Sequence, residues 1–318
     1  MERATPLVSI ITPSFNQGQF IEETILSIHE QTYKNIEYFV IDGGSTDQTL
    51  EILKKYSEFI AWISEPDNGQ TDAINKGIRK SHGEIIAYLN SDDLYLPGSI
   101  KMVVDYFTDH SDVDMIYGDI IHIDDHSRFI EQVKTGTISL EQYLTCQVYL
   151  PQPAVFFRKT VVEKIGYFDE NLHLAMDLDY WIRTFLSVNT AYISQPLAKA
   201  RFYGETKSSV GYLNNFTEWL YILEKTFRNE ELFIRYFSSR NRAAAVKNDA
   251  YAYVYFFGGL RLLRCRKVLP AIKNILKGLT LKMRLVFNPY LFWSVFVFVF
   301  GIRASDYLLR FLPRIKKV

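Results

Sequence analysis

The first hundred residues alternate short apolar runs with amphipathic stretches, and this alternation restricts the fold more than any other feature of the sequence. Apolar runs typical of buried strands lie at residues 7–11, 36–41, 59–64 and 84–89. Stretches in which apolar side chains recur with helical spacing lie between them, at residues 20–30, 49–56 and 71–81. Strands that alternate with helices in this way build βαβ units around a parallel sheet. We therefore expect an α/β fold with a mixed, mainly parallel sheet flanked by helices.

The pattern changes after residue 97 and again near residue 212. Residues 115–123 and 128–133 are typical of an antiparallel strand pair, and shorter strands are expected at 154–157, 192–193 and 200–203. A helix is expected over 177–186, and the chain reads as mostly helical from 212 onward. We expect three regions in the 318 residues: 1–105 and 106–211 as the two halves of one α/β domain, and 212–318 as a helical extension.

Charge is distributed unevenly along the chain, although 36 basic and 36 acidic residues cancel. Residues 261–318 carry 13 basic and one acidic side chain, a net charge of +12, so the first 260 residues carry −12. A basic end of this kind indicates an anionic partner, either a membrane surface or a nucleic acid. Because apolar residues are interleaved with the basic ones, the composition favours lipid over nucleic acid.

The apolar stretch 285–302 raises the question of a membrane span. It is interrupted by Pro289 and lies at the short edge of the ~20 residues that a spanning helix needs. The sequence therefore favours a helix in the membrane interface or a shallow re-entrant segment, and a helix packed on the protein's own core is the alternative.

Composition narrows the class of protein further. A hydrophobic fraction of 48% is enough for a packed core and excludes an intrinsically disordered chain. The two cysteines, Cys146 and Cys265, cannot form a disulfide framework or a cysteine-based zinc site. No signal-peptide pattern is visible at the N-terminus. These features predict a cytoplasmic protein, peripheral on the cytoplasmic face of a membrane.

Acidic clusters follow two of the expected strands, at the edge where open α/β sheets bind ligands. The first, Asp42 to Asp47, contains two glycines that allow close approach to a ligand, but it also suits a tight turn. In that turn Ser45 and Gln48 have the spacing of a helix capping box. The second cluster, Asn90-Ser91-Asp92-Asp93, places adjacent carboxylates together, which a divalent cation would neutralise. A solvated turn is the alternative.

A third acidic cluster, around Asp177 and Asp179, lies at the expected start of a helix. A carboxylate there interacts favourably with the helix dipole. It also has the chemistry of a general base that deprotonates a hydroxyl. Spacing alone does not separate these two roles.

Taken together and in order, these motifs resemble the family 2 glycosyltransferases of the GT-A fold. The matching segments are residues 8–16, 42–47, 91–93 and 177–183, and residues 64–77 resemble one large bacterial, non-processive subgroup. The resemblance covers residues 7–203. Two departures are Asn90, which replaces the first Asp of the DxD motif, and Met176, which replaces an acid that often precedes the base. No Q-x-x-R-W motif follows, which argues against a processive polysaccharide synthase.

The resemblance implies a role for each matching residue. The expected ligands of a nucleoside diphosphate sugar, with UDP favoured, are Thr12, Pro13, Asn16, Asp42, Asp72, Asn75, Lys76, Ser91 and Asp92. Asp92 is the expected ligand of a divalent metal, Mn²⁺ or Mg²⁺, and Asp177 is the expected general base. We also expect Asp119 and Gln152 to line the acceptor site.

The expected activity is therefore metal-dependent transfer of a sugar, with inversion, from the nucleotide to an acceptor hydroxyl. The basic C-terminal region suggests a lipid-linked or membrane-proximal glycan acceptor, as in surface polysaccharide or glycolipid assembly. A catalytically inactive membrane-bound scaffold is the alternative from another class of protein. A sugar-phosphate nucleotidyltransferase would need a glycine-rich loop after the first strand, where residues 12–16 read Thr-Pro-Ser-Phe-Asn. A dinucleotide oxidoreductase is disfavoured because no G-x-G-x-x-G follows any expected strand.

Overall fold

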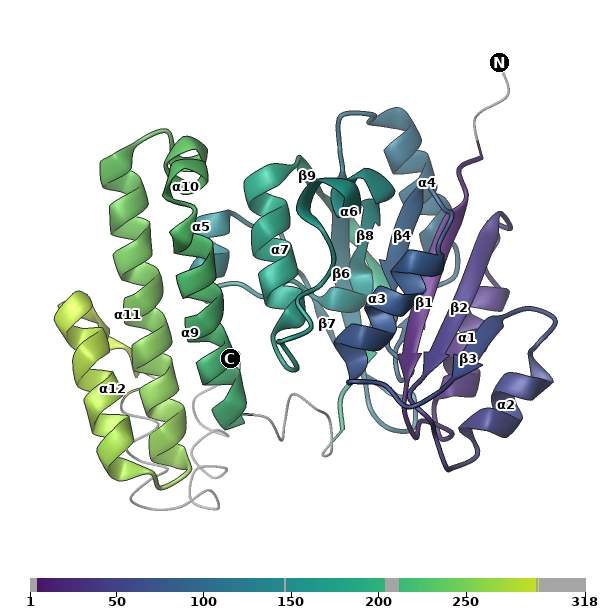
Figure 1. Cartoon of the computed structure of the whole chain (residues 1–318), viewed down its shortest axis with the longest axis horizontal. Coiled ribbons are helices and arrows are strands. Elements are labelled where there is room, and N and C mark those ends of the chain that lie inside the picture. Colours follow the sequence, from purple (N-terminus) through teal and green to yellow (C-terminus); the bar gives the residue numbers. More distant parts are fainter. Residues whose placement is uncertain (1–4, 146, 204–211, 290, 292–318) are drawn as a thin grey trace. The chain divides into compact units, whose positions relative to one another are not determined.

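The computed structural model describes residues 5–145, 147–203, 212–289 and 291 (Figure 1). The chain divides into two compact units. The first comprises Met1–Leu140 and Val148–Thr206, and the second comprises Glu141–Gln147 and Lys207–Val318. All strands of the described residues belong to the first unit, and the second is helical.

One mixed sheet forms the centre of the first unit. Its strands are β1 (Val8–Ser14), β2 (Ile36–Asp42), β3 (Ala61–Ser64), β4 (Ile85–Tyr88), β5 (Leu94–Tyr95), β6 (Met115–Ile123), β7 (Phe129–Val133), β8 (Val155–Arg158) and β9 (Thr190–Arg201). The strand order is β3-β2-β1-β4-β8-β6-β9-β5, with β7 paired to β6. The strands from β3 to β4 are mutually parallel, and β8 pairs antiparallel with both β4 and β6. Every residue of β1 is buried, as expected for a central strand covered on both faces.

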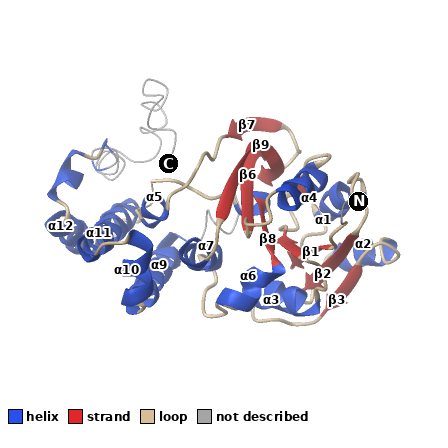
Figure 2. Ribbon diagram, turned by 90° about the horizontal axis from the view of Figure 1, so that it is seen from above, coloured by secondary structure: helices blue, strands red, loops and turns tan. Residues whose placement is uncertain are grey.

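Helices cover both faces of this sheet (Figure 2). The helical segments of this unit are α1 (Ile21–His29), α2 (Thr49–Lys55), α3 (Gln70–Lys80), α4 (Ser99–Asp109), η1 (Gln152–Ala154), α6 (Lys159–Ile165) and α7 (Met176–Ser187). The short helix α5 (Leu140–Leu144) belongs to the second unit except for its first residue. Helices α1 and α4 lie on one face, where Ile25 and Val103 join the buried core around Ile10. Helices α3 and α6 lie on the other face. There Gly77 allows close contact, because a Cβ at this position would lie 2.4 Å from the Ile11 side chain.

The expected α/β fold is confirmed, with one correction among the strands. Residues 192–193 and 200–203 were expected as two short strands, but β9 is continuous from Thr190 to Arg201. The polar sequence around Pro196 hides this continuity, and the pairing with β6 shifts register where Pro196 faces Asp119. A bulge accommodates a proline there because proline has no N–H to donate to the ladder.

The second unit is built from α9 (Tyr212–Arg228), α10 (Glu230–Phe237), α11 (Arg240–Arg264), α12 (Val268–Leu281) and the short η2 (Met283–Phe287). Asn229 and Ser239 cap α10 and α11, because their side chains accept hydrogen bonds from backbone N–H groups of the first turn. Helix α12 packs closely on α11 at Gly278, where a Cβ would lie 2.7 Å from the Ala252 carbonyl. Among the described residues, no helix has both the length and the hydropathy needed to cross a bilayer. Most of the apolar stretch 285–302 lies outside the described residues.

Candidate active site

The carboxyl ends of the parallel strands bring the predicted donor-binding segments to one edge of the sheet. Ser14 at the end of β1 is in register with Asp42 at the end of β2, and Asp42 is in register with Ser64 of β3. Strand β4 ends at Tyr88, directly before the Asn90–Asp93 turn. The structure therefore places the first two acidic clusters on the same edge, which is where open α/β sheets bind ligands.

The Asp42 carboxylate is fully buried and is held by its own turn. Its Oδ2 accepts hydrogen bonds from the backbone N–H groups of Gly44 (3.1 Å) and Ser45 (2.8 Å) and from the Ser64 hydroxyl (2.7 Å). Its Oδ1 accepts a further hydrogen bond from the Ser45 hydroxyl. Four internal donors thus surround Asp42, and they fix the shape of the loop that follows β2.

The loop after β1 is joined to this turn. Asn16 has a positive φ of 52°, its backbone N–H donates to the Ser45 hydroxyl (2.7 Å), and its side-chain oxygen accepts from Thr46 N–H (2.9 Å). Thr12 and Pro13 are buried in β1, and the Thr12 hydroxyl accepts a hydrogen bond from Tyr38 (2.9 Å). The three predicted donor-binding residues of this segment therefore lie in β1 and in the loop that follows it, and Asn16 is joined to the turn of Asp42.

The predicted donor residues of α3 are held by ion pairs and hydrogen bonds within the chain. Lys76 Nζ lies 2.9 Å from Glu65 and 3.3 Å from Asp72, and hydrogen bonding to Glu65 raises the pKa of this lysine. The side-chain amide of Asn75 donates to the Phe168 carbonyl (2.9 Å) and to Glu170 (3.0 Å). Asn75 thus joins α3 to the segment that precedes α7.

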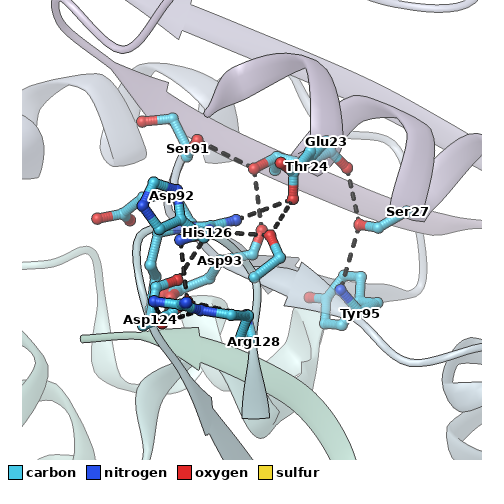
Figure 3. Close-up of polar contacts among 12 residues, drawn as sticks. Glu23, Thr24, Ser27, Ser91, Asp92, Asp93, Tyr95, Asp124, His126 and Arg128 are labelled. Atoms are coloured by element: carbon cyan, nitrogen blue, oxygen red, sulfur yellow. Dashed lines mark hydrogen bonds and ion pairs between the residues drawn. The ribbon is translucent and has the colours of Figure 1, made fainter. Parts of the chain in front are cut away.

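The Asn90–Asp93 turn is held by a side chain of α1 (Figure 3). The Thr24 hydroxyl lies within hydrogen-bond distance of the carbonyls of Ser91 (3.0 Å) and Asp93 (2.9 Å). The Asp93 carboxylate is buried and accepts from Arg201 N–H (2.9 Å) and from the Asn90 amide (3.3 Å). Burial, followed by the negative charge of Asp92, holds the pKa of Asp93 well above its usual range.

Asp92 differs from its neighbour because its half-buried carboxylate has a hydroxyl partner. Its Oδ2 accepts a hydrogen bond of 3.1 Å from the Tyr203 hydroxyl. Burial raises the pKa of Asp92, although the Tyr203 hydrogen bond and Arg201 oppose the shift. Burial and the Asp92 charge raise the pKa of Tyr203 to about 12, so this hydroxyl is protonated and donates at neutral pH.

The chemistry of this turn fits a divalent cation that is shared with a substrate. Within the part of the chain that the structure describes, no group of three His, Cys, Asp or Glu side chains is arranged to enclose a metal ion. Mg²⁺ and Mn²⁺ are commonly held by one or two carboxylates together with substrate phosphates. Asp92, a partly buried carboxylate whose ionised form is disfavoured by burial, is the residue of this turn that could hold such a cation.

Asp177 lies in the first turn of α7, and contacts of α3 connect its surroundings to the Asn90–Asp93 turn. Gln70 donates to the Asn90 side chain (2.7 Å), and the next residue, Thr71, donates to the Leu172 carbonyl (2.7 Å). One Asp177 carboxylate oxygen accepts from the N–H of Leu178 at 2.8 Å. The third acidic cluster therefore reaches the same end of the sheet as the second.

The pKa of Tyr149 is affected by one carboxylate from each of the two acidic clusters. Tyr149 is 60% exposed, so it lies at the protein surface. Partial desolvation by the surrounding protein, followed by the negative charges of Asp177 and Asp93, raises the pKa of Tyr149. A carboxylate from each of the two clusters therefore influences the same hydroxyl group.

The two predicted acceptor residues occupy different surroundings. Asp119 is buried at the β6 bulge, where its Oδ1 accepts from Thr135 N–H (2.8 Å) and the Tyr192 hydroxyl (2.6 Å). Gln152, in η1, donates its amide to the Tyr88 carbonyl at the end of β4 (2.6 Å). Its buried side-chain oxygen has no hydrogen-bond partner among the described residues. Gln152 thus offers an acceptor atom at the end of β4, next to the Asn90–Asp93 turn.

Sequence reasoning did not single out several residues that contact this site. Thr24, Tyr149 and Arg201 are separated from Asp92 by tens of residues, and none belongs to a recognisable motif. The sequence offers one weak signal, which is that a charged residue, Arg201, lies within the expected strand 200–203.

Comparison with known proteins identifies the family. The model of the family described as glycosyl transferase family 2 matches residues 9–165. An uncharacterized glycosyltransferase of Rickettsia typhi is 31% identical over 247 residues, which cover 73% of this chain and 76% of that relative. The chain belongs to glycosyl transferase family 2. An uncharacterized family relative from Mycobacterium tuberculosis is 33% identical over 188 residues, covering 58% of this chain and 70% of its own.

Solved structures share the GT-A fold of this glycosyltransferase, as the sequence resemblance implied. S. aureus TarS residues 1–349, in complex with UDP-GlcNAc, superposes with a TM-score of 0.61 at 20% identity, covering 85% of this chain and 89% of TarS. The mannosyltransferase PcManGT from Pyrobaculum calidifontis, in complex with GDP-Man and Mn²⁺, gives a TM-score of 0.60 at 17% identity, covering 97% and 88%. At these identities the likeness establishes the fold, and the ligands are properties of those two proteins.

Proposed function

We propose that this glycosyltransferase moves a sugar from a nucleoside diphosphate sugar, with UDP favoured, to an acceptor hydroxyl with inversion at the anomeric carbon. The observation that carries the proposal is the pair of hydrogen bonds from the start of α3, Gln70 to Asn90 and Thr71 to the Leu172 carbonyl, which supports a shared site for the two acidic clusters. Asp92, next to Asp93, then faces the diphosphate and Asp177 faces the acceptor. This arrangement suits a one-step displacement between opposite sides of the sugar.

Each carboxylate has a separate task in this proposal. Asp177 accepts the proton of the acceptor hydroxyl as the oxygen attacks the sugar. Asp92 would hold a divalent cation, Mn²⁺ or Mg²⁺, and such a cation would supply positive charge to stabilise the departing diphosphate. The buried turn of Asp42 shapes the binding site of the base, to which Thr12, Pro13 and Asn16 would contribute. Gln152 offers its unpartnered oxygen to a sugar or acceptor hydroxyl.

A panel of nucleotide sugars tests this activity directly. We expect the protein to hydrolyse or transfer at least one UDP- or GDP-linked sugar with Mn²⁺ or Mg²⁺, and to lose that activity in EDTA. The anomeric configuration of the product, read by NMR, tests inversion. Binding of nucleotides without any turnover, across the panel and with glycan and glycolipid acceptors, would favour the inactive scaffold instead.

We further propose that the helical unit holds the enzyme on an anionic membrane surface, where it meets a lipid-linked or membrane-proximal acceptor of surface polysaccharide or glycolipid assembly. On α12, Leu269 (82% exposed), Ile272 (47%) and Leu276 (58%) recur with helical spacing, beside the exposed Lys273 and Lys277. Residues 251–287 contain eight basic and no acidic side chains. An exposed apolar row next to cations suits the interface of an anionic bilayer.

Vesicle flotation of the full chain tests the membrane proposal. We expect binding to vesicles that contain phosphatidylglycerol and little binding to pure phosphatidylcholine. Leu269→Gln with Ile272→Gln should weaken the binding, while the matched pair Phe129→Gln with Ile130→Gln, at exposed apolar positions of β7, should not. Equal flotation of both double variants would remove α12 from the proposal.

A further inference from the structure

The end of β9 faces the Asp92–Asp93 turn and closes one side of it. The Arg201 guanidinium is fully buried, and its Nε donates to the backbone carbonyl of Asp92 at 2.9 Å. Its other nitrogens donate to the Asp124 carbonyl (3.0 Å) and to the Glu23 carboxylate (3.0 Å). Arg201 therefore fixes the main chain of the turn, while its positive charge is paired with Glu23.

The side chain of Asp92, in contrast, is hydrogen-bonded to an uncharged group. Tyr203, two residues after Arg201, donates its hydroxyl hydrogen to Asp92 Oδ2 at 3.1 Å. The Tyr203 ring packs against Phe20, with 5.2 Å between ring centroids, which directs the phenol toward the turn. The Gln17 side chain hydrogen-bonds to the same hydroxyl, and its own buried amide oxygen has no partner among the described residues.

This arrangement differs from that of the neighbouring carboxylate. The Asp93 carboxylate accepts hydrogen bonds from the backbone N–H of Arg201 and from the side-chain amide of Asn90 in its own turn. Breaking either bond would disturb the packing of β9 or of the turn. Within the described part of the chain, the Asp92 carboxylate has one side-chain hydrogen-bond partner, a hydroxyl that rotates about its own bonds and carries no charge. A lysine or arginine in that place would repel a cation, whereas a phenol hydroxyl stabilises the carboxylate without doing so.

We propose that the Tyr203 hydroxyl is a placeholder for the divalent cation, occupying the Asp92 oxygen that the cation takes when the nucleotide sugar binds. The inference rests on the proposed function, because it assumes that Asp92 is the metal ligand. In the metal-free protein the hydroxyl offsets part of the cost of burying Asp92. Metal binding then exchanges this hydrogen bond for coordination, so the hydrogen bond lowers the affinity for the cation.

The test is a Mn²⁺ titration of the donor-free protein, followed by electron paramagnetic resonance of the free ion. Tyr203→Phe keeps the ring against Phe20 and removes the hydroxyl, so we expect Mn²⁺ to bind about five-fold more tightly, as for the loss of one competing hydrogen bond. Tyr192→Phe is the matched control, because it also removes a tyrosine hydroxyl that donates to a carboxylate, in this case from β9 to Asp119. The control should bind Mn²⁺ as the wild type does.

The outcomes separate this inference from the proposed function. If Asp92→Asn weakens Mn²⁺ binding but Tyr203→Phe leaves it unchanged or weaker, the placeholder is wrong and the metal site stands. If Asp92→Asn binds Mn²⁺ as well as the wild type does, the metal site and the placeholder fail together. Melting temperatures of the variants check the fold, and Tyr203→Leu, which also lacks the hydroxyl, should share the tighter binding if the phenylalanine variant is unstable.

Discussion

Two acidic turns at the same edge of the sheet use their carboxylates in different ways. Asp42 is fully buried and accepts four hydrogen bonds, all from its own loop and from the neighbouring strand. Asp92 is half-buried, its main chain is fixed by Arg201, and its Oδ2 accepts one hydrogen bond from a tyrosine hydroxyl. Both residues come from motifs that resemble the same family, and both follow a parallel strand.

The difference indicates which carboxylate can change partner during a reaction. A carboxylate with four internal donors keeps them when substrate binds, because each broken bond would leave a buried donor unsatisfied. A carboxylate with one exchangeable hydrogen-bond partner could release that partner and bind a cation instead. We infer that Asp42 acts mainly by shaping its loop and that Asp92 acts by direct contact, and substitutions can separate the two roles.

Asp92→Asn should have the largest effect on activity. The amide has nearly the same size but lacks the negative charge, so we expect metal-dependent donor turnover to fall on the order of 10³-fold. Because burial raises the pKa of Asp92, removing the charge should leave the melting temperature unchanged or slightly higher. Steady-state turnover and calorimetry measure the two quantities. A variant that keeps more than a tenth of the activity would contradict a direct role for Asp92.

Asp177→Asn should lower turnover by at least about 10²-fold while leaving nucleotide binding intact. The Asp177 side chain accepts a hydrogen bond from Leu178 N–H in the first turn of α7, and an amide oxygen can retain that contact. Isothermal titration with UDP and GDP provides the binding control. Loss of nucleotide affinity with unchanged turnover at saturation would place Asp177 in the donor site and move the base elsewhere.

Asp42→Asn should affect stability more than chemistry, in contrast to Asp92→Asn. The amide nitrogen of the variant cannot accept the hydrogen bonds that one carboxylate oxygen now accepts, so we expect a loss of about 3 kcal/mol in the free energy of unfolding. For a domain of this size the melting temperature should fall by about 6–12 °C. Nucleotide affinity should fall only modestly. An unchanged melting temperature with lost nucleotide affinity would instead make Asp42 a direct ligand of the base.

The sequence predicted the positions of these residues better than their partners. Hydrophobic periodicity located the strands from β1 to β4, and the motif order then placed Asp42 and Asp92 at strand ends. The capping box expected from Ser45 and Gln48 is absent, because the Ser45 hydroxyl donates to Asp42 and α2 begins without a side-chain cap. A spacing pattern shows only which groups are near in sequence. Whether the Ser45 hydroxyl binds Asp42 or caps α2 depends on the folded structure.

Contacts across long sequence separations were beyond the reach of sequence reasoning. Arg201 and Tyr203 meet the Asp92–Asp93 turn only because β9 runs beside β6 and pairs with β5, which directly follows that turn. The bulge at Pro196 also concealed the length of β9. Patterns within a window of residues do not specify such pairings, which depend on the order of strands in the whole sheet.

A third carboxylate, that of Glu37, is expected to contribute a small amount to stability and nothing to activity. It lies near the start of β2, at the opposite end of the strand from Asp42, and its Oε1 accepts from the Ser9 hydroxyl and from the N–H groups of His82 (2.5 Å) and Gly83 (2.9 Å). Burial alone would raise the pKa of Glu37, but these hydrogen bonds together lower it. The ionised form is therefore favoured in the folded state.

Glu37→Gln should accordingly lower the free energy of unfolding by about 1 kcal/mol at pH 7, with activity unchanged. Because the folded-state pKa lies below the unfolded value of about 4.3, this contribution is fully present above that pH and is lost as the pH falls through the folded-state pKa. Denaturant unfolding of wild type and variant between pH 7 and pH 3 measures the difference. If the difference in the free energy of unfolding stays constant over this range, it does not come from the charge of Glu37 but from packing around residue 37. Glu37 and Asp42 would then be alike only in the number of hydrogen bonds that they accept.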